Sequence, residues 1–229
     1  MLIKGLQKTT LLDYPGKVAC TFFTGGCNFR CPFCHNASLV LHTETVDSIA
    51  EQELLDFLKK RSVILDGVCI TGGEPLLQPD LERVCERIHD LGLLIKLDTN
   101  GSFPQRLEQL IDKSFIDYVA MDIKNSKDEY ARTCGLRRFP QEVDASIRLI
   151  MSAQIPYEFR TTVLREFHSP ESMDALAQWI QGAQKYFLQG FQDSGNLIGQ
   201  DLSAFTPEEM KELLQIVKPY IPSAELRGI

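Results

Sequence analysis

The chain has 229 residues and a formal net charge of −7. This length suits one domain with a sizeable core, so a single domain over residues 1–229 is predicted. The acidic balance, without any basic block, argues against direct binding to nucleic acid or to an anionic membrane. No apolar run approaches the ~20 residues needed to span a bilayer. Residues 1–17 contain no apolar region of a secretory signal, so a cytoplasmic protein is expected.

Short apolar runs alternate with segments of helical period along the chain. The runs predict six buried strands, over residues 18–24, 68–71, 93–98, 118–123, 157–163 and 186–191. The other segments predict helices over residues 46–61, 81–91, 105–112, 143–153, 173–182 and 207–217. Candidate N-caps are Asp47 or Ser48, Ser169 and Thr206. Strands that are each followed by a helix imply a parallel sheet with right-handed crossovers. Because only six units fit, we expect an α/β fold that forms an open partial (β/α)6 barrel.

The most informative motif contains Cys27, Cys31 and Cys34, spaced C-x3-C-x2-C in the run GGCNFRCPFCHN. Three thiolates in one short loop can hold three corners of a [4Fe–4S] cluster, whereas an electron-transfer cluster normally takes four cysteine ligands. The fourth iron would then be open to a small molecule that chelates it through an amino and a carboxylate group. Phe33 would help to cover such a cluster from water.

Two other metal sites match the same residues. Cys31 to His35 reads C-x-x-C-H, the attachment sequence of c-type haem, and three cysteines with His35 could form a structural zinc site. Haem attachment belongs to exported proteins, and no export signal is recognised here. A zinc site remains possible from these residues, but it leaves the motifs at the later strand ends unexplained.

Further motifs follow the predicted strands, where the chemistry of a β/α barrel is found. After the second strand, Gly72 and Gly73 would let the backbone approach a ligand closely, and Glu74 could accept from an ammonium group. A tight turn with a solvated acid is the alternative interpretation of these three residues.

Charged residues end the next two strands: Asp98 with Thr99, and Asp122 with Lys124. Two acids and a lysine at neighbouring strand ends could bind a cation and a ligand that bears a carboxylate. A salt bridge between Lys124 and either acid is equally compatible with the spacing.

Taken together, these motifs resemble the radical S-adenosylmethionine (SAM) enzymes and, over nearly the whole chain, their glycyl-radical-enzyme activases. The opening run GLQKTTLLDYPGK, at residues 5–17, and the cysteine run are similar to the activating proteins of anaerobic ribonucleoside-triphosphate reductase. The resemblance implies one cluster held by the three cysteines, because residues 36–67 contain no cysteine for a second one.

The resemblance also assigns SAM-binding roles to strand-end residues. Glu74 would hold the amino group of SAM, and Asp98 and Thr99 of the D-T-N-G segment would contribute to its pocket. Asp122 and Lys124 of the D-x-K segment would lie beside the methionine portion. Arg160 would lie near the SAM carboxylate, for which its planar fork is suited. His168 aligns only loosely with a histidine near the ribose, and a lone loop histidine is ordinarily not a ligand.

The implied activity begins with transfer of an electron from the reduced cluster to the SAM sulfonium. The products are methionine and a 5′-deoxyadenosyl radical, which abstracts hydrogen from a glycine Cα of a partner glycyl radical enzyme. A flavodoxin- or ferredoxin-type protein would supply the electron. The alternatives are a small-molecule radical SAM enzyme similar to 7-carboxy-7-deazaguanine synthase, and a non-catalytic iron–sulfur or zinc scaffold.

Four of the seven cysteines lie outside the motif. Cys20 and Cys69 fall in predicted strands and Cys85 in a predicted helix, so we expect them to be buried as small apolar side chains. Cys134 is expected to be a loop thiol.

Overall fold

In the computed structural model, which describes residues 1–229, eight strands form one sheet in chain order. The strands are β1 (Ile3–Thr10), β2 (Ala19–Thr24), β3 (Gly67–Gly72), β4 (Leu94–Thr99), β5 (Tyr118–Asp122), β6 (Tyr157–Val163), β7 (Tyr186–Gly190) and β8 (Glu225–Arg227). β1 pairs antiparallel with β2, and every later neighbour is parallel. All six predicted strands are confirmed, because strands buried on both faces consist of near-continuous apolar runs.

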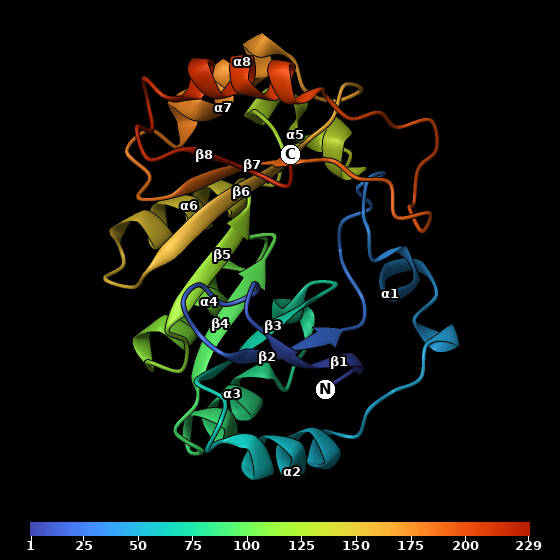
Figure 1. Ribbon diagram of the computed structural model, residues 1–229, viewed down its shortest axis with the longest axis vertical. Helices are drawn as coiled ribbons and strands as arrows, with labels where there is room; N and C mark the ends of the chain where they lie inside the picture. Colours follow the sequence, from blue (N-terminus) through green and yellow to red (C-terminus); the bar gives the residue numbers. More distant parts are fainter.

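All helices except the first pack on one side of this curved sheet, and the first lies by itself at the right of the view, on the side toward which the sheet curves (Figure 1). They are α1 (Ala37–Leu41), α2 (Glu51–Arg61), α3 (Leu81–His89), α4 (Pro104–Asp112), α5 (Lys127–Cys134), α6 (Gln141–Ser152), α7 (Pro170–Trp179) and α8 (Pro207–Val217). Two short 3-10 turns, η1 (Thr43–Thr45) and η2 (Pro75–Leu77), complete the list. Sheet and helices share one contiguous core of 49 buried residues. None of the helices has the length and apolar character needed to cross a membrane.

Two of the three predicted helix starts are confirmed. Ser169 and Thr206 each form a capping box at the first turn of α7 and α8. The start of α2 was predicted wrongly, because its N-cap is Ala50 rather than Asp47 or Ser48. The preceding Ile49 forms a bridge with Ile3, which keeps the backbone extended up to that point.

Four strands or helices were not predicted: β1, β8, α1 and α5. β1 is an edge strand with only its two end residues buried, and β8 has only three residues. The prediction of Cys134 as a loop thiol is wrong, since it is the last residue of α5 and is fully buried. The helix ends there because Gly135 adopts a left-handed conformation, with φ of 66°.

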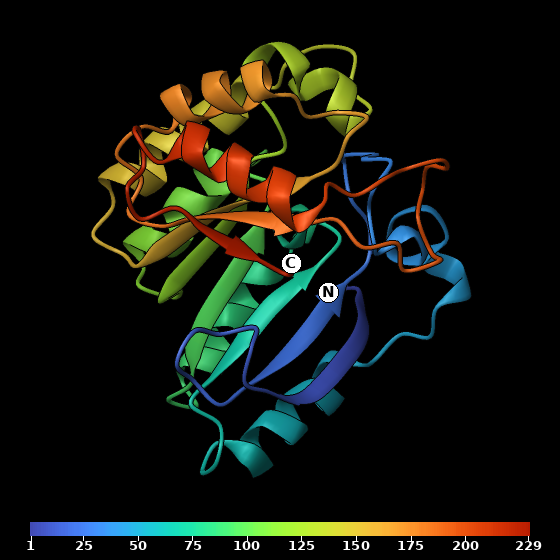
Figure 2. The same cartoon turned by 45° about the horizontal axis from the view of Figure 1, so that its top comes forward.

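The sheet is open, because its edge strands β1 and β8 do not pair with each other. The expected open α/β architecture is confirmed, with eight strands rather than six. Ile3 pairs with Thr24 at the end of β2, so β1 begins at the edge of the sheet where the parallel strands end. β8 runs parallel to β7 and therefore ends at the same edge. Both chain ends lie beside the gap between these edge strands (Figure 2).

Candidate functional site

A cavity of about 280 Å³ lies at the carboxyl ends of the parallel strands, near the lower limit of ordinary small-molecule sites. Most of the predicted site residues line it: Cys27, Cys31, Phe33, Cys34, Gly72, Gly73, Asp98, Thr99, Asp122, Lys124 and Arg160. Glu74 and His168 are the exceptions. These residues meet because parallel strands present all their carboxyl ends at one edge of the sheet.

The cysteine loop is shaped by its own backbone. Cys34 N donates to Cys31 O at 3.0 Å, which forms a tight turn around Phe33. The Arg30 guanidinium donates to Cys27 O at 2.6 Å and so holds the first part of the loop. Burial raises the pKa of Cys27 to about 12. Phe33 is buried and therefore shields one wall of the cavity from water.

Two distant segments hold the back of this loop. At the end of α5, Cys134 O accepts from Arg30 N at 2.9 Å. In the segment after β7, Gly199 N donates to Pro32 O at 2.7 Å. The loop is thus fixed by parts of the chain that lie more than a hundred residues away.

The donor set fits an iron–sulfur cluster better than a single ion. A structural zinc ion needs four ligands that converge tetrahedrally, and no three His, Cys, Asp or Glu side chains converge in this way. In a cubane each thiolate bonds a separate iron, so Cys27, Cys31 and Cys34 need only share one cavity, as they do. His35 Nε2 lies 2.6 Å from Gln192 O, so its ring is engaged by the segment after β7.

The glycines after β3 permit close contact with the start of the cysteine loop. A Cβ atom at Gly73 would lie 1.9 Å from Gly26 O, and Gly72 has a φ of 113° that side chains rarely adopt. Glu74 N donates to the same Gly26 O at 2.8 Å. The Gly-Gly-Glu turn therefore lies directly against the residue that precedes Cys27.

Glu74 is completely buried and is satisfied within the protein. Its carboxylate accepts from Leu76 N at 3.0 Å, from Thr99 Oγ1 at 2.8 Å and from Asn100 N at 2.7 Å. Burial raises its pKa to about 7. The contact with a SAM amino group stays a prediction, whereas in this structure Glu74 ties the turn after β3 to the end of β4.

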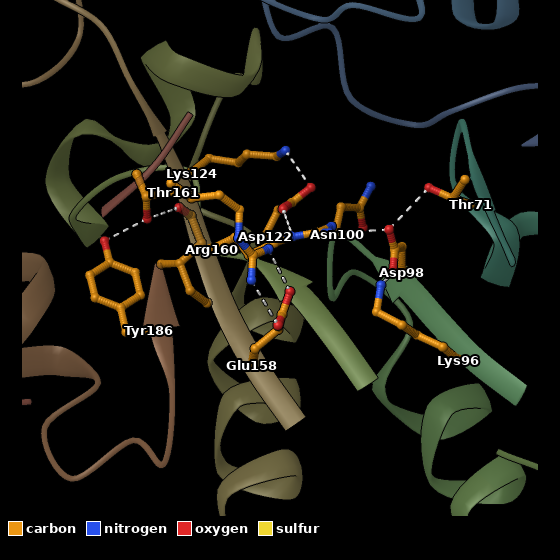
Figure 3. Close-up of polar contacts among 12 residues, drawn as sticks. Thr71, Lys96, Asp98, Asn100, Asp122, Lys124, Glu158, Arg160, Thr161 and Tyr186 are labelled. Atoms are coloured by element: carbon orange, nitrogen blue, oxygen red, sulfur yellow. Dashed lines mark hydrogen bonds and ion pairs between the residues drawn. The ribbon is translucent and has the colours of Figure 1, made fainter. Parts of the chain in front are cut away.

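A chain of ion pairs crosses the cavity wall (Figure 3). Arg160 lies at its centre, with Nε 2.9 Å from Asp122 Oδ1 and a terminal nitrogen 3.2 Å from Asp98 Oδ2. Lys124 Nζ is 3.0 Å from Asp122 Oδ2, and the buried Lys96 pairs with Asp98. Burial alone would raise the pKa of Asp122, but Arg160 and Lys124 hold it well below its usual range.

The charges of this chain of ion pairs do not cancel. Its members are Lys96, Asp98, Asp122, Lys124 and Arg160. It has one more positive than negative group, so it can accept the carboxylate of a ligand. The salt bridge between Lys124 and Asp122, expected as one reading of the spacing, is present.

His168 is buried beside the ion pairs without lining the cavity. Its Nε2 lies 2.9 Å from Lys124 O, and its Nδ1 lies 3.3 Å from the backbone of Leu164. It therefore holds the backbone of Lys124. The proposed contact with a ribose stays a prediction.

Asn100 and Lys96 are two of the residues at this site that were not singled out from the sequence. Asn100 follows Thr99 in the D-T-N-G segment, and its side-chain nitrogen lies 3.0 Å from Asn28 Oδ1 in the cysteine loop. Lys96 stands inside an apolar strand run. A lysine in such a run was a usable signal, because a buried lysine needs an acidic partner.

The comparisons with known proteins agree with this geometry. The family model described as "Radical SAM superfamily" matches residues 21–180. A protein of Methanocaldococcus jannaschii, provisionally named a glycyl-radical enzyme activating enzyme, is 31% identical over 238 residues, which covers 100% of this chain and 96% of that protein. The 7-carboxy-7-deazaguanine synthase of Hyperthermus butylicus is 35% identical over 122 residues, which covers 52% of this chain and 48% of that one.

The fold also has solved relatives. The crystal structure of Streptococcus suis SuiB bound to S-adenosylmethionine matches with a TM-score of 0.69 at 15% sequence identity. The match covers 89% of this chain and 48% of SuiB, so the chain spans about half the length of that protein. At this identity the likeness concerns the fold alone.

Proposed function

Because the chain belongs to the radical SAM superfamily, we propose that it activates a glycyl radical enzyme by creating a radical on one of its peptide glycines. Membership of the superfamily brings a [4Fe–4S] cluster and SAM as cofactors. When bound, the cluster supplies the electron that cleaves SAM to methionine and a 5′-deoxyadenosyl radical. The full-length similarity to the M. jannaschii protein carries the choice of a glycyl radical enzyme as partner.

In this proposal Cys27, Cys31 and Cys34, which line the cavity, would hold three irons of the cluster and leave the fourth iron open to SAM. Phe33 excludes water from one side, and its ring packs against Phe167 with centroids 6.1 Å apart. Enclosure of the site matters because a primary carbon radical would otherwise abstract hydrogen from C–H or S–H bonds other than that of its target.

The ion pairs across the cavity wall orient SAM. Arg160 and Lys124 face the cavity, and their excess positive charge suits the carboxylate of the methionine portion. Asp98 and Asp122 keep both cations in place before the ligand arrives, so little reorganisation is needed on binding. Thr99, held by Glu74, completes this wall.

The target is a glycine of another protein, because the sheet is open between β1 and β8. Such an opening can admit a flexible peptide segment, and a glycine radical is stabilised by the two flanking amides. The partner we propose is anaerobic ribonucleoside-triphosphate reductase, on the strength of the similar run at residues 5–17 and the CNFRCPFCHN run. A flavodoxin- or ferredoxin-type protein is the proposed electron donor.

The test combines chemistry on SAM with a signal on the partner. Anaerobically reconstituted protein, reduced with dithionite and given SAM, should release 5′-deoxyadenosine. With the reductase added, a glycyl-radical doublet should appear in electron paramagnetic resonance, and a partner with that glycine changed to alanine should give none. Absence of 5′-deoxyadenosine from iron-loaded protein would overturn the radical SAM activity. A silent reductase would overturn only the choice of partner.

A second candidate is a small-molecule enzyme of the 7-carboxy-7-deazaguanine synthase type. It is favoured by the 35% identity to the H. butylicus synthase, although that match covers only half of each chain. Consumption of 6-carboxytetrahydropterin together with SAM, while the reductase stays radical-free, would support this function over activation.

A further inference from the structure

Lys96 is the most deeply buried of the charged side chains that form the ion pairs across the cavity wall. Its side chain is 2% exposed, whereas those of Asp98 and Arg160 are each 14% exposed. Lys96 and Asp98 are two positions apart on β4, so their side chains lie on the same face of the sheet. Asp98 lines the cavity and Lys96 does not. Lys96 therefore lies one layer below the wall that a ligand would touch.

Asp98 is the one acid that forms an ion pair with Lys96. The residues beside Lys96 on the neighbouring strands are Cys69 on β3 and Tyr118 on β5. Burial raises the pKa of both groups, so both stay neutral. The Lys96 side chain ends at the carboxylate of Asp98 (Figure 3). Asp98 is consequently the group through which the charge of Lys96 acts.

The two carboxylate oxygens of Asp98 have different partners. Oδ1 accepts from Lys96, and Oδ2 accepts from Arg160 at 3.2 Å and from Thr71 Oγ1 at 3.3 Å. Arg160 Nε also donates to Asp122 at 2.9 Å, so two of the five guanidinium N–H donors are used. Arg160 therefore keeps donors for a ligand in the cavity that it lines.

Lys96 determines the net charge of this wall. The cations are Lys96, Lys124 and Arg160, and the acids are Asp98 and Asp122. Without Lys96 the numbers of positive and negative groups would be equal. Charges in a partly buried site interact over several ångströms. Lys96 can therefore attract a carboxylate that it does not touch.

We propose that Lys96 is a positioning residue that makes the cavity select SAM by its carboxylate. Lys96 neutralises Asp98 and so leaves the charge of Arg160 for the ligand. The proposal rests on the proposed function, because SAM is the ligand that it concerns. A ligand with the adenosine and the sulfonium but without the carboxylate gains nothing from Lys96.

The experiment measures the binding of SAM and of decarboxylated SAM to reconstituted protein by calorimetry. Lys96→Met should bind SAM roughly tenfold more weakly than wild type, the size of a charge interaction across several ångströms of partly solvated protein. Its affinity for decarboxylated SAM should be that of wild type. The control Lys113→Met removes an exposed lysine paired with Glu82 and should bind both ligands as wild type does.

A double variant separates the charge of Lys96 from its packing. Lys96→Met combined with Asp98→Asn removes one positive and one negative group, which restores the excess of one positive charge. The new amide oxygen can still accept from Arg160. We expect the double variant to bind SAM more tightly than Lys96→Met alone.

Three results would overturn the proposal: unchanged SAM affinity in Lys96→Met, an equal loss for both ligands, or a double variant that binds SAM no better than the single one. If Lys96→Met does not fold, Lys96→Gln removes the charge while it keeps a donor for Asp98, and the same outcomes apply. The proposed function is judged separately, by 5′-deoxyadenosine release and by the glycyl-radical signal with the wild type. A wild type active in both assays, with unchanged SAM affinity in the variants, would refute the role of Lys96 alone.

Discussion

The side-chain amide of Asn100 lies 3.7 Å from the sulfur of Cys27, although 73 positions separate the two residues in the chain. The backbone nitrogen of Asn100 donates to Glu74 at 2.7 Å. The end of β4 therefore connects the cysteine loop with the Gly-Gly-Glu turn. Substitutions in the Gly-Gly-Glu turn should therefore affect cluster binding as well as SAM binding.

The three motif cysteines should be individually required for the cluster. Replacement of Cys27, Cys31 or Cys34 by alanine should reduce the iron content of anaerobically reconstituted protein from about four per chain toward zero. Iron and sulfide assays measure this directly. The matched control is Cys20→Ala, which removes a buried thiol of β2. Full iron in any of the three motif variants would refute the ligand assignment.

Gly73→Ala should damage the cluster loop without touching a ligand. Its Cβ would lie 1.9 Å from the backbone oxygen of Gly26, so the turn or the loop must move. We expect lower iron content and weaker SAM binding together. Gly92→Ala is a useful control, because Gly92 has a φ of 74° but nothing within 4 Å. Gly92→Ala therefore adds a backbone strain that Gly73→Ala does not have, but no steric clash, and it should keep the cluster.

Arg160→Met should weaken SAM binding while the cluster survives. Loss of a charge-assisted partner for the ligand carboxylate costs about 1–3 kcal/mol, roughly a 5- to 150-fold loss of affinity. Calorimetry on reconstituted protein measures it. Arg148→Met, which removes an exposed arginine paired with Asp144 on α6, should bind SAM normally. Equal SAM affinity in Arg160→Met and wild type would show that Arg160 does not bind SAM.

Arg160→Met should also lower stability, for a separate reason. Asp98 and Asp122 would keep their buried charges with one partner fewer, and breaking a buried pair is strongly destabilising. Urea unfolding of the apo-protein separates this effect from the loss of ligand affinity.

His168 should make the protein less stable in mild acid. Burial lowers its pKa to about 4, whereas an unfolded histidine titrates near 6.5. Between these values the unfolded state binds more protons, so stability decreases as the pH falls. The expected loss from this group is about 2 kcal/mol between pH 7 and pH 5. Urea unfolding at both pH values should show a smaller loss in His168→Gln. The same loss in both proteins would contradict this account.

The sequence predicted the central strands because their apolar runs are buried on both faces. It did not predict β1, where the burial pattern contains three consecutive exposed residues and gives no clear strand period. It also missed α5, whose sequence KDEYARTC is largely polar and places only a few side chains in the core. Edge strands and surface helices have a weaker hydrophobic pattern than central strands, so their secondary structure depends more on tertiary contacts.

The candidate site was predictable to the extent that it lies at strand ends. Asp98, Asp122 and Arg160 come from three successive parallel strands, and their meeting follows from the topology. The contact between Arg30 N and Cys134 O does not, because it depends on how α5 folds back over the loop. The hydrogen bonds to the Glu74 carboxylate do not follow from the topology either. Two of their donors are backbone nitrogens, of Leu76 and Asn100, and a backbone donor cannot be recognised from the residue type.

The segment after β7 has a consequence for the order of assembly. It reaches the cysteine loop through Gly199 and Pro32, and it lies beside α1 (Figures 1 and 2). During synthesis the cysteines leave the ribosome well before residue 199 does, and contacts of such long range form late in folding. The nascent chain therefore exposes three thiols before it can enclose them. We expect stable iron binding only after residue 199 has been synthesised, when the segment after β7 can hold the cysteine loop in place.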